Sequence, residues 1–427
     1  MALPFAQRGA GTQPGRLPAA AQKGDRRVNL RQSLACVLLA VFFLLAVACG
    51  LPGAQAQTSQ KGSVVVLDPA VEQLISPNAK LQPVKLNYFG RMEGPVWVPG
   101  PGMSGYLLFP EVAGNLVYKW QPNCAKYPCG TKGDLSVYAT NVAFTGTSQQ
   151  FNDVGFITYN GRIYVIHVGP VGLALDPQLR LIVTAFGDHT MVRYDKDKQR
   201  TVIASSWQGM HLNCPDDTVV KTDGTIYWTD GPQTCYRQRS PFDFNESNQQ
   251  IKFPGLYMIK DGENQLLDKT NPGVNGVALS PDQKTLYVTG PHDTLLKYDV
   301  QPDDTVTNRR LFIDMLASAH ITNPQRDTAD AIFPDGVRVD SRGDIWTPGP
   351  GGIWIISPEG KHLGTILPPS DPDLLKYQVF CSLAFGDNGK TLYIDGNTSL
   401  WQIPVKVCGS SVPPFTCNND KNYPLSH

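Results

Sequence analysis

The sequence predicts an all-β protein, a six-bladed β-propeller with an N-terminal signal segment. The main observation is a short unit that returns six times, each copy opening on a polar or small residue and continuing through a turn into a β-rich run. Units of this size cannot bury a face alone, so they are expected to stack or to close into a ring. Six of them are typical of a β-propeller. The copies begin at Glu93, Val171, Asp216, Asn275, Asp335 and Cys381.

Composition favours one large β-rich domain. The 40 glycines and 35 prolines follow no strict period and lie between short apolar runs, which indicates turns rather than disorder. Because the repeats extend over most of the 427 residues, we expect a single propeller domain over residues 58–408. The formal net charge is zero, so the chain shows no basic footprint for a nucleic-acid partner.

The first 57 residues are of a different kind and predict export. A basic leader is followed by an uncharged apolar run, Leu34 to Leu51, and then by Ala54-Gln55-Ala56, a small-x-small sequence of the kind that signal peptidase cleaves. We therefore expect a mature chain that starts near Gln57 and is periplasmic or secreted. The alternative is a membrane anchor, formed by residues 34–51 or by a lipid at Cys49, since eighteen apolar residues are barely enough to span a bilayer.

The segments between the repeats predict the remaining elements in chain order. Ser63-Val64-Val65-Val66-Leu67 is β-rich and is expected to close the ring against the last blade, which removes an exposed sheet edge. The longest departure from the repeat, residues 121–160, predicts a loop that acts as a lid or specificity element. The run from Arg310 to Ala319 is the best candidate for a short helix. Residues 409–427, rich in Pro and Asn, predict a surface tail.

Seven cysteines lie beyond the signal segment and allow local disulfides in an oxidising compartment. Free thiols at all of these positions are the alternative, because connectivity does not follow from a sequence. No Cys-x-x-Cys pair occurs, which argues against a zinc ribbon or a thioredoxin-type site. The candidate pairs are Cys124/Cys129, Cys408/Cys417 and, less strongly supported, Cys214/Cys235.

Familiar catalytic signatures are missing from the sequence. It contains no Gly-x-Ser-x-Gly elbow, no His-Glu-x-x-His, no dinucleotide fingerprint and no Walker loop. Cys381 opens a repeat, but no histidine is near it in the sequence. A small buried thiol is therefore expected there rather than a nucleophile.

Four of the six residues that open the repeats carry oxygen ligands: Glu93, Asp216, Asn275 and Asp335. Since equivalent positions in a propeller face one axis, these side chains are expected to meet at the mouth of the channel, where three carboxylates would repel one another. A hard divalent cation resolves the repulsion, and Ca²⁺ is the ion we expect, with Mg²⁺, Mn²⁺ and Zn²⁺ as alternatives. For any single position the alternative is an ordinary Asp-Gly or Asn-Gly turn.

Five short motifs follow one another in a fixed order along the repeats. They are Glu93-Gly94-Pro95-Val96-Trp97, Leu212-Asn213-Cys214-Pro215-Asp216-Asp217, Val274-Asn275-Gly276-Val277-Ala278-Leu279, Phe333-Pro334-Asp335-Gly336 and Phe385-Gly386-Asp387-Asn388-Gly389. In these motifs the chain resembles the gluconolactonase, senescence-marker-protein (regucalcin) and luciferin-regenerating-enzyme family. Each motif alone is weak, whereas five in order over nearly the whole mature chain are specific.

The resemblance implies a six-bladed propeller with one axial divalent metal and hydrolysis of sugar lactones or related cyclic esters. Asp335 would be the general base that activates water. The implied metal ligands are Glu93, Asn275 and Asp335, and the implied contacts to a lactone-like small molecule are Asn213, Asp216 and His211. Asn213 and Asp216 would alternatively complete the metal shell.

Some positions depart from the family pattern and bear on the substrate. The family usually has Asn where this chain has Asp216, Arg where it has His211, and often Asn where it has Val171. Two other functions therefore stay open. One is a propeller that binds a ligand or protein without chemistry, and the other is a different reaction at the same metal site.

Overall fold

The protein was analysed as a computed structural model, and its chain divides into two units, residues 1–56 and 57–427. All described residues belong to the second unit. They are 62–102, 104–146, 156–159, 162–165, 168–231, 249–318, 334–369 and 380–410. The predicted signal segment with residues 34–51 lies outside them, as do residues 411–427 of the predicted surface tail, Cys235, Cys417 and Phe333. The first two residues of that tail are described, and Gly409 is buried, so a surface tail beginning at residue 409 is wrong at its start.

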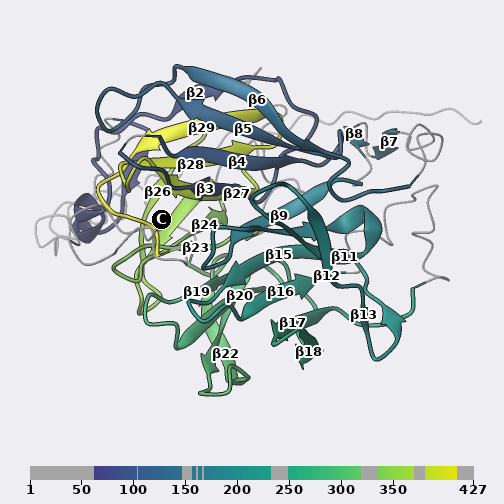
Figure 1. The fold of residues 1–427 in the computed structure, drawn as a ribbon. Helices are drawn as coiled ribbons and strands as arrows, with labels where there is room; N and C mark the ends of the chain where they lie inside the picture. The colour runs from purple at the N-terminus through teal and green to yellow at the C-terminus, as the bar shows by residue number, and fades with distance from the viewer. Residues whose placement is uncertain are drawn as a thin grey trace, which may run out of the picture. The chain divides into compact units, whose positions relative to one another are not determined.

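Six antiparallel sheets surround one axis, which confirms the predicted six-bladed β-propeller (Figure 1). In each blade the first strand lies toward the middle of the view and the last toward the rim. Blade 1 consists of β3 (Val96–Val98), β4 (Tyr106–Glu111), β5 (Leu116–Pro122) and β6 (Gly133–Thr140). Blade 2 consists of β9 (Pro170–Leu175), β10 (Leu181–Ala185), β11 (Thr190–Tyr194) and β12 (Arg200–Ala204). Blade 3 consists of β15 (Pro215–Val220), β16 (Ile226–Asp230), β17 (Gly255–Lys260) and β18 (Glu263–Asp268).

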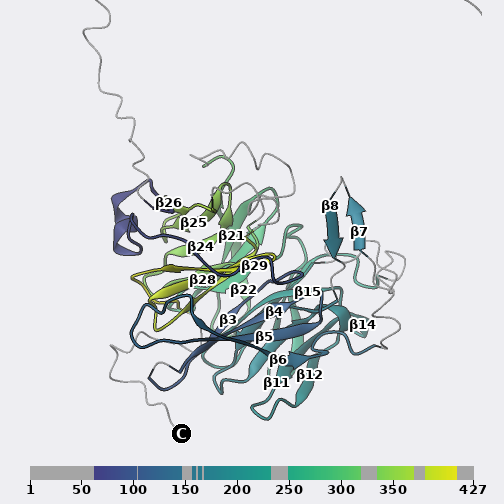
Figure 2. The same ribbon diagram turned by 90° about the horizontal axis from the view of Figure 1, so that it is seen from above.

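The second half of the ring repeats this order. Blade 4 consists of β19 (Val277–Leu279), β20 (Thr285–Gly290), β21 (Thr294–Val300) and β22 (Val306–Asp314). Blade 5 consists of β23 (Arg338–Val339), β24 (Ile345–Gly349), β25 (Gly352–Ile356) and β26 (His362–Ile366), and β1 (Val64–Val66) extends it. Blade 6 consists of β27 (Ser382–Gly386), β28 (Thr391–Gly396) and β29 (Ser399–Pro404), and β2 (Gln82–Lys85) completes it. Two hairpins are separate from the blade sheets: β7 (Phe156–Tyr159) with β8 (Arg162–Val165), and β13 (Ser206–Trp207) with β14 (Met210–His211). Figure 2 shows β7 and β8 standing apart from the blades.

The core is divided among the six interfaces between neighbouring blades. Each interface holds its own apolar cluster, and each cluster draws on the two blades that meet there. Successive side chains of a strand point to opposite faces. In β3, for example, Trp97 packs toward blade 6 and its neighbour Val96 toward blade 2. Both faces of a blade are therefore buried, which is why the inner strands read as nearly continuous apolar runs.

Ring closure differs from the sequence expectation. The run Ser63–Leu67 supplies β1, but β1 pairs with β26 at the edge of blade 5, and it is β2 that pairs with β29 of the last blade. The physical reason is burial, since Val64 and the 3₁₀ turn η1 (Pro69–Gln73) belong to the apolar cluster between blades 5 and 6. The more polar β2 takes the exposed outer edge.

Two further local expectations have an outcome here. The predicted helix over residues 310–319 is wrong, because Arg310–Asp314 is part of β22 and its pairing with β21 overrides the helical pattern. The Cys124–Cys129 disulfide is confirmed, with a Cα–Cα distance of 5.0 Å. Cys214 and Cys408 also lie in disulfides, whose other halves fall outside the described residues. Within the described part of the chain, no helix is long and apolar enough to cross a membrane.

Candidate metal centre on the propeller axis

The residues that open the repeats stand at one end of the axial channel. Residues of the first strands of all six blades, β3, β9, β15, β19, β23 and β27, line this channel. The openers Glu93, Asp216, Asn275 and Asp335 lie at or just before the start of these strands in blades 1, 3, 4 and 5. Residues at the same position of successive repeats therefore lie around one axis.

Three carboxylates meet in this ring. One oxygen from each of Glu93, Asp216 and Asp335 lies within 4.8 Å of the other two. Oxygens that bind one Ca²⁺ at 2.3–2.6 Å cannot be farther apart than about 5 Å. The three side chains can therefore share a single ion. Glu93 and Asp216 are buried, whereas Asp335 is partly exposed.

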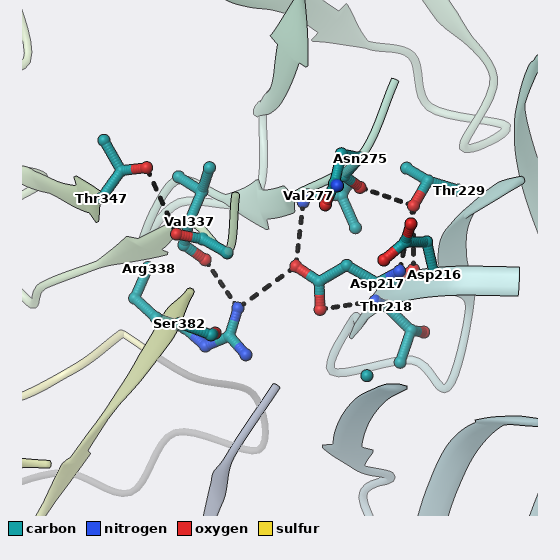
Figure 3. Close-up of polar contacts among 12 residues, drawn as sticks. Asp216, Asp217, Thr218, Thr229, Asn275, Val277, Val337, Arg338, Thr347 and Ser382 are labelled. Atoms are coloured by element: carbon teal, nitrogen blue, oxygen red, sulfur yellow. Dashed lines mark hydrogen bonds and ion pairs between the residues drawn. The ribbon is translucent and has the colours of Figure 1, made fainter. Parts of the chain in front are cut away.

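Asn275, the fourth oxygen-bearing opener, carries an amide oxygen instead of a carboxylate. Its Oδ1 is buried and has no hydrogen-bond partner among the described residues. A buried amide oxygen without a partner is unfavourable, so such an atom usually indicates a ligand or an ion. The backbone carbonyl of Asn275 is fixed by the Thr229 hydroxyl of blade 3, which donates to it at 2.5 Å (Figure 3).

Asp216 is held in the same way by the preceding blade. Its backbone carbonyl accepts a hydrogen bond of 2.7 Å from the hydroxyl of Thr184, on β10 of blade 2. The sequence placed Asp216 either on the substrate or in the metal shell, and the geometry brings it to the other two carboxylates. Blades 2 and 3 thus fix the backbone of the oxygen-bearing residues that follow them.

The glycine after an opener has a packing role. A Cβ on Gly276 would lie 1.9 Å from the carbonyl oxygen of Asp335, and one on Gly172 would lie 2.6 Å from that of Asp216. Neither glycine has a positive φ. At these two positions glycine is needed because neighbouring blades approach closely at the axis, rather than because the chain turns there.

The carboxylates destabilise one another's charged forms. Burial, followed by the charges of Glu93 and Asp217, raises the pKa of Asp216 well above its ordinary value. Burial, Glu93 and Asp216 do the same to the pKa of Asp335. Mutual repulsion in a site sheltered from water favours either a bound proton or a bound cation.

One cation, missed in the sequence, lies against this cluster. Arg91 forms an ion pair with Glu93, with 2.5 Å between Nη2 and Oε1. Its positive charge partly opposes the rise in the pKa of both Asp216 and Asp335. The only sequence signal for it was its position two residues before the opener of blade 1.

Two buried acids at the ends of second strands were also missed. Asp230 accepts backbone N–H groups from Asn213 and Cys214, and burial raises its pKa to about 7. Asp395 accepts backbone N–H groups from Cys381 and Ser382, and burial raises its pKa to about 8. The Asp-Gly that ends each of these strands was the signal that could have revealed them.

The three residues predicted to contact substrate are placed very differently. Asn213 is fully buried, and its side-chain amide donates to the Phe253 carbonyl while its Oδ1 has no partner among the described residues. His211 is exposed at the end of β14, and its backbone N–H donates to the Gln250 side chain. Only Asp216 belongs to the carboxylate cluster, and the substrate contacts stay predictions.

An ion pair crosses the channel next to the cluster. Arg338 of blade 5 donates to Asp217 of blade 3 at 3.4 Å, and the same carboxylate oxygen accepts the Val277 N–H of blade 4 (Figure 3). Beyond this pair the channel lining is mostly apolar as far as Gly409 and Ser410. The polar chemistry is therefore confined to one end of the axis.

Known proteins match both the sequence and the fold. The family model described as SMP-30/Gluconolactonase/LRE-like region matches residues 92–397. A gluconolactonase from Zymomonas mobilis is 25% identical over 395 residues, which are 90% of this chain and 99% of that protein. The matched region includes every predicted site residue.

Solved structures show the same fold. A gluconolactonase from Xanthomonas campestris has a TM-score of 0.59 at 23% identity, over 80% of this chain and 94% of that one. A luciferin-regenerating enzyme has a TM-score of 0.52 at 15% identity, over 78% of this chain and 97% of that one. The chain therefore belongs to the SMP-30/gluconolactonase/LRE-like family, and its relatives support a lactonase-type hydrolase that acts on a small molecule.

Proposed function

We propose that this chain is a divalent-metal-dependent hydrolase of sugar lactones or related cyclic esters. The observation that carries the proposal is the meeting of Glu93, Asp216 and Asp335 within one coordination sphere. The buried, unpartnered Oδ1 of Asn275 supports it as a fourth donor. The similarity to a gluconolactonase over nearly the whole chain supplies the reaction class.

The donor set favours a hard cation. Carboxylate and amide oxygens suit Ca²⁺, and a flexible shell of oxygen ligands fits it better than the strict octahedron that Mg²⁺ requires. Mn²⁺ accepts similar ligands and is the second choice. Among the described residues no imidazole or thiolate belongs to the carboxylate cluster, which disfavours Zn²⁺.

The bound ion and Asp335 would have different roles in lactone hydrolysis. When bound, the ion would polarise the lactone carbonyl and stabilise the oxyanion that forms on it. Asp335 is the partly exposed carboxylate of the three, so it is the one that can reach a water molecule at the channel mouth. It accepts a proton as the water oxygen bonds to the carbonyl carbon. It then returns the proton to the ring oxygen as the C–O bond breaks, which leaves an open-chain hydroxy acid.

Proton release from a panel of lactones tests the proposal. The purified protein is expected to acidify a weakly buffered lactone solution, to stop when a chelator removes the ion, and to recover with Ca²⁺ or Mn²⁺. Metal binding by calorimetry without turnover on any lactone would favour a binding propeller instead. Turnover that survives exhaustive chelation would contradict the metal-dependent mechanism.

The variant Asp335→Asn tests whether Asp335 acts as the general base without disturbing the fold. Removing the proton acceptor is expected to lower turnover by about 10²–10⁴-fold. Asp197→Asn, an exposed site in the turn between β11 and β12, is the matched control and is expected to retain activity. Circular dichroism checks that both variants fold. An active Asp335→Asn enzyme would remove this residue from the mechanism.

We also propose that the protein is exported to the periplasm or the medium. The basic leader, the apolar run and the small-x-small site support this localisation, and the Cys124–Cys129 disulfide suits an oxidising compartment. Fractionation with intact-mass analysis is expected to find a soluble chain that begins near Gln57. An uncleaved chain in the membrane fraction would support the anchor.

A further inference from the structure

Arg91 holds a carboxylate that the metal would need. Its Nη2 and Nε lie 2.5 and 2.6 Å from the same oxygen, Oε1 of Glu93. Two charge-assisted hydrogen bonds to one oxygen make a strong and directional contact. An ion that approaches Glu93 therefore meets a carboxylate that already has a positively charged partner.

The position of Arg91 is built into the blade. Glu111, a buried residue at the end of β4, accepts the backbone N–H groups of Gly90 and Arg91 at 2.9 and 3.0 Å through one oxygen. Its other oxygen accepts the N–H of Gly114 at 2.6 Å. These bonds fix the backbone that carries Arg91, so the ion pair is not a chance contact of a long surface side chain.

The charge of Arg91 reaches the whole cluster. It acts on Asp216 and Asp335 as well as on Glu93, and its side chain is only 26% exposed. Water therefore screens it weakly. Without a metal, Arg91 relieves part of the repulsion among three carboxylates, and with a metal bound the same charge repels the ion.

We propose that Arg91 is a built-in counter-ion that competes with the divalent metal for Glu93 and so sets the affinity of the site. This inference rests on the proposed metal centre. The arginine stabilises the metal-free protein and weakens metal binding.

Calorimetric titration with CaCl₂ tests the idea on the full mature chain. Arg91→Met is expected to bind Ca²⁺ at least about tenfold more tightly than the wild type, since a repelling charge beside the ion is gone. Its metal-free form is expected to melt at a lower temperature, and added Ca²⁺ is expected to raise that temperature more than in the wild type. Arg91→Lys keeps the charge and is expected to stay within about threefold of the wild-type affinity.

A second ion pair supplies the matched control. Arg180 and Asp176 have a similar separation, 2.6 Å, and similar side-chain exposure, 31% and 5% against 26% and 7% for Arg91 and Glu93. Arg180→Met removes an arginine of the same kind from the turn between β9 and β10 and is expected to leave the Ca²⁺ affinity unchanged. Arg91→Gln serves as a second neutral variant if Arg91→Met does not fold.

The possible results separate this inference from the function on which it depends. If the wild type binds Ca²⁺ and the neutral variants bind it equally or more weakly, Arg91 is no competitor, while the metal centre stands. If the wild type binds no divalent ion, both the proposed metal centre and the proposed role of Arg91 are contradicted. Tighter binding in the neutral variants, with Arg180→Met unchanged, supports the proposal.

Discussion

The two ends of the axial channel are built from the same six strands but have opposite chemistry. At one end the strands begin with Glu93, Asp216 and Asp335 side by side. Further along, the lining becomes mostly apolar, with residues such as Leu175 and Val220. The Arg338–Asp217 pair lies between them. The carboxylate cluster and the apolar part of the channel are thus only a few residues apart along each strand. Mutations in the cluster are expected to change metal affinity, and mutations in the apolar part are expected to change stability.

The largest expected effect falls on stability and comes from the apolar end. Leu175→Ala removes a buried side chain from the cluster between blades 1 and 2 and leaves a cavity, which is expected to cost about 2–5 kcal/mol of unfolding free energy. Denaturant unfolding measures the loss. Calorimetry is expected to show unchanged Ca²⁺ affinity, and a large change in that affinity would mean that the two ends are coupled.

The next largest effect is a change in Ca²⁺ affinity, caused by a mutation at the polar end of the channel. Asp216→Asn keeps an oxygen donor but removes one negative charge, so Ca²⁺ is expected to bind roughly tenfold more weakly, about 1.4 kcal/mol. The metal-free protein is expected to become more stable, because the repulsion among the carboxylates falls. A metal-free variant less stable than the wild type would show that Asp216 is held by attractive contacts that the structure does not contain.

The smallest effect is a pH dependence of the metal-free protein. Asp395 has a pKa raised to about 8, so the folded state binds more protons than the unfolded state above the ordinary pKa of 3.8. Its contribution to stability is present at low pH and is lost as the pH rises from about 4 to 8. We expect thermal unfolding at pH 8 to show a loss of about 1 kcal/mol relative to pH 7.

Asp395→Asn tests which group causes that slope. The amide keeps an acceptor for the N–H groups of Cys381 and Ser382 but does not titrate, so the pH dependence is expected to flatten. An unchanged slope would assign it to Asp230 or to the ring carboxylates. Measurements with saturating Ca²⁺ separate these, since a bound ion would suppress titration of its own ligands.

The sequence predicted the axial ring because repeats carry positional information. Glu93 and Asp335 are 242 positions apart along the chain, yet they occupy the same offset in blades 1 and 5. The structure brings their oxygens together as that offset requires. Turn formation was the alternative explanation for single Asp-Gly and Asn-Gly positions, whereas at Gly276 the close approach of two blades requires glycine.

The features that the sequence missed depend on side-chain direction and strand pairing. Arg91 looked like any other charged residue, because nothing in the sequence shows that its guanidinium turns toward Glu93. The closing strand was assigned to the valine run at 64–66 because an apolar run usually makes a strand. Which edge that strand pairs with depends on burial against blade 5, and only the three-dimensional packing determines it.

The pairing of β2 with β29 has a consequence for how the molecule is made. Gln82–Lys85 leaves the ribosome before any blade, and its partner Ser399–Pro404 is among the last described segments to be synthesised. This strand must therefore wait for almost the entire polypeptide before its partner is made. Its glutamine, proline and lysine suit a strand that stays in water during this delay, because such residues discourage pairing with another nascent chain.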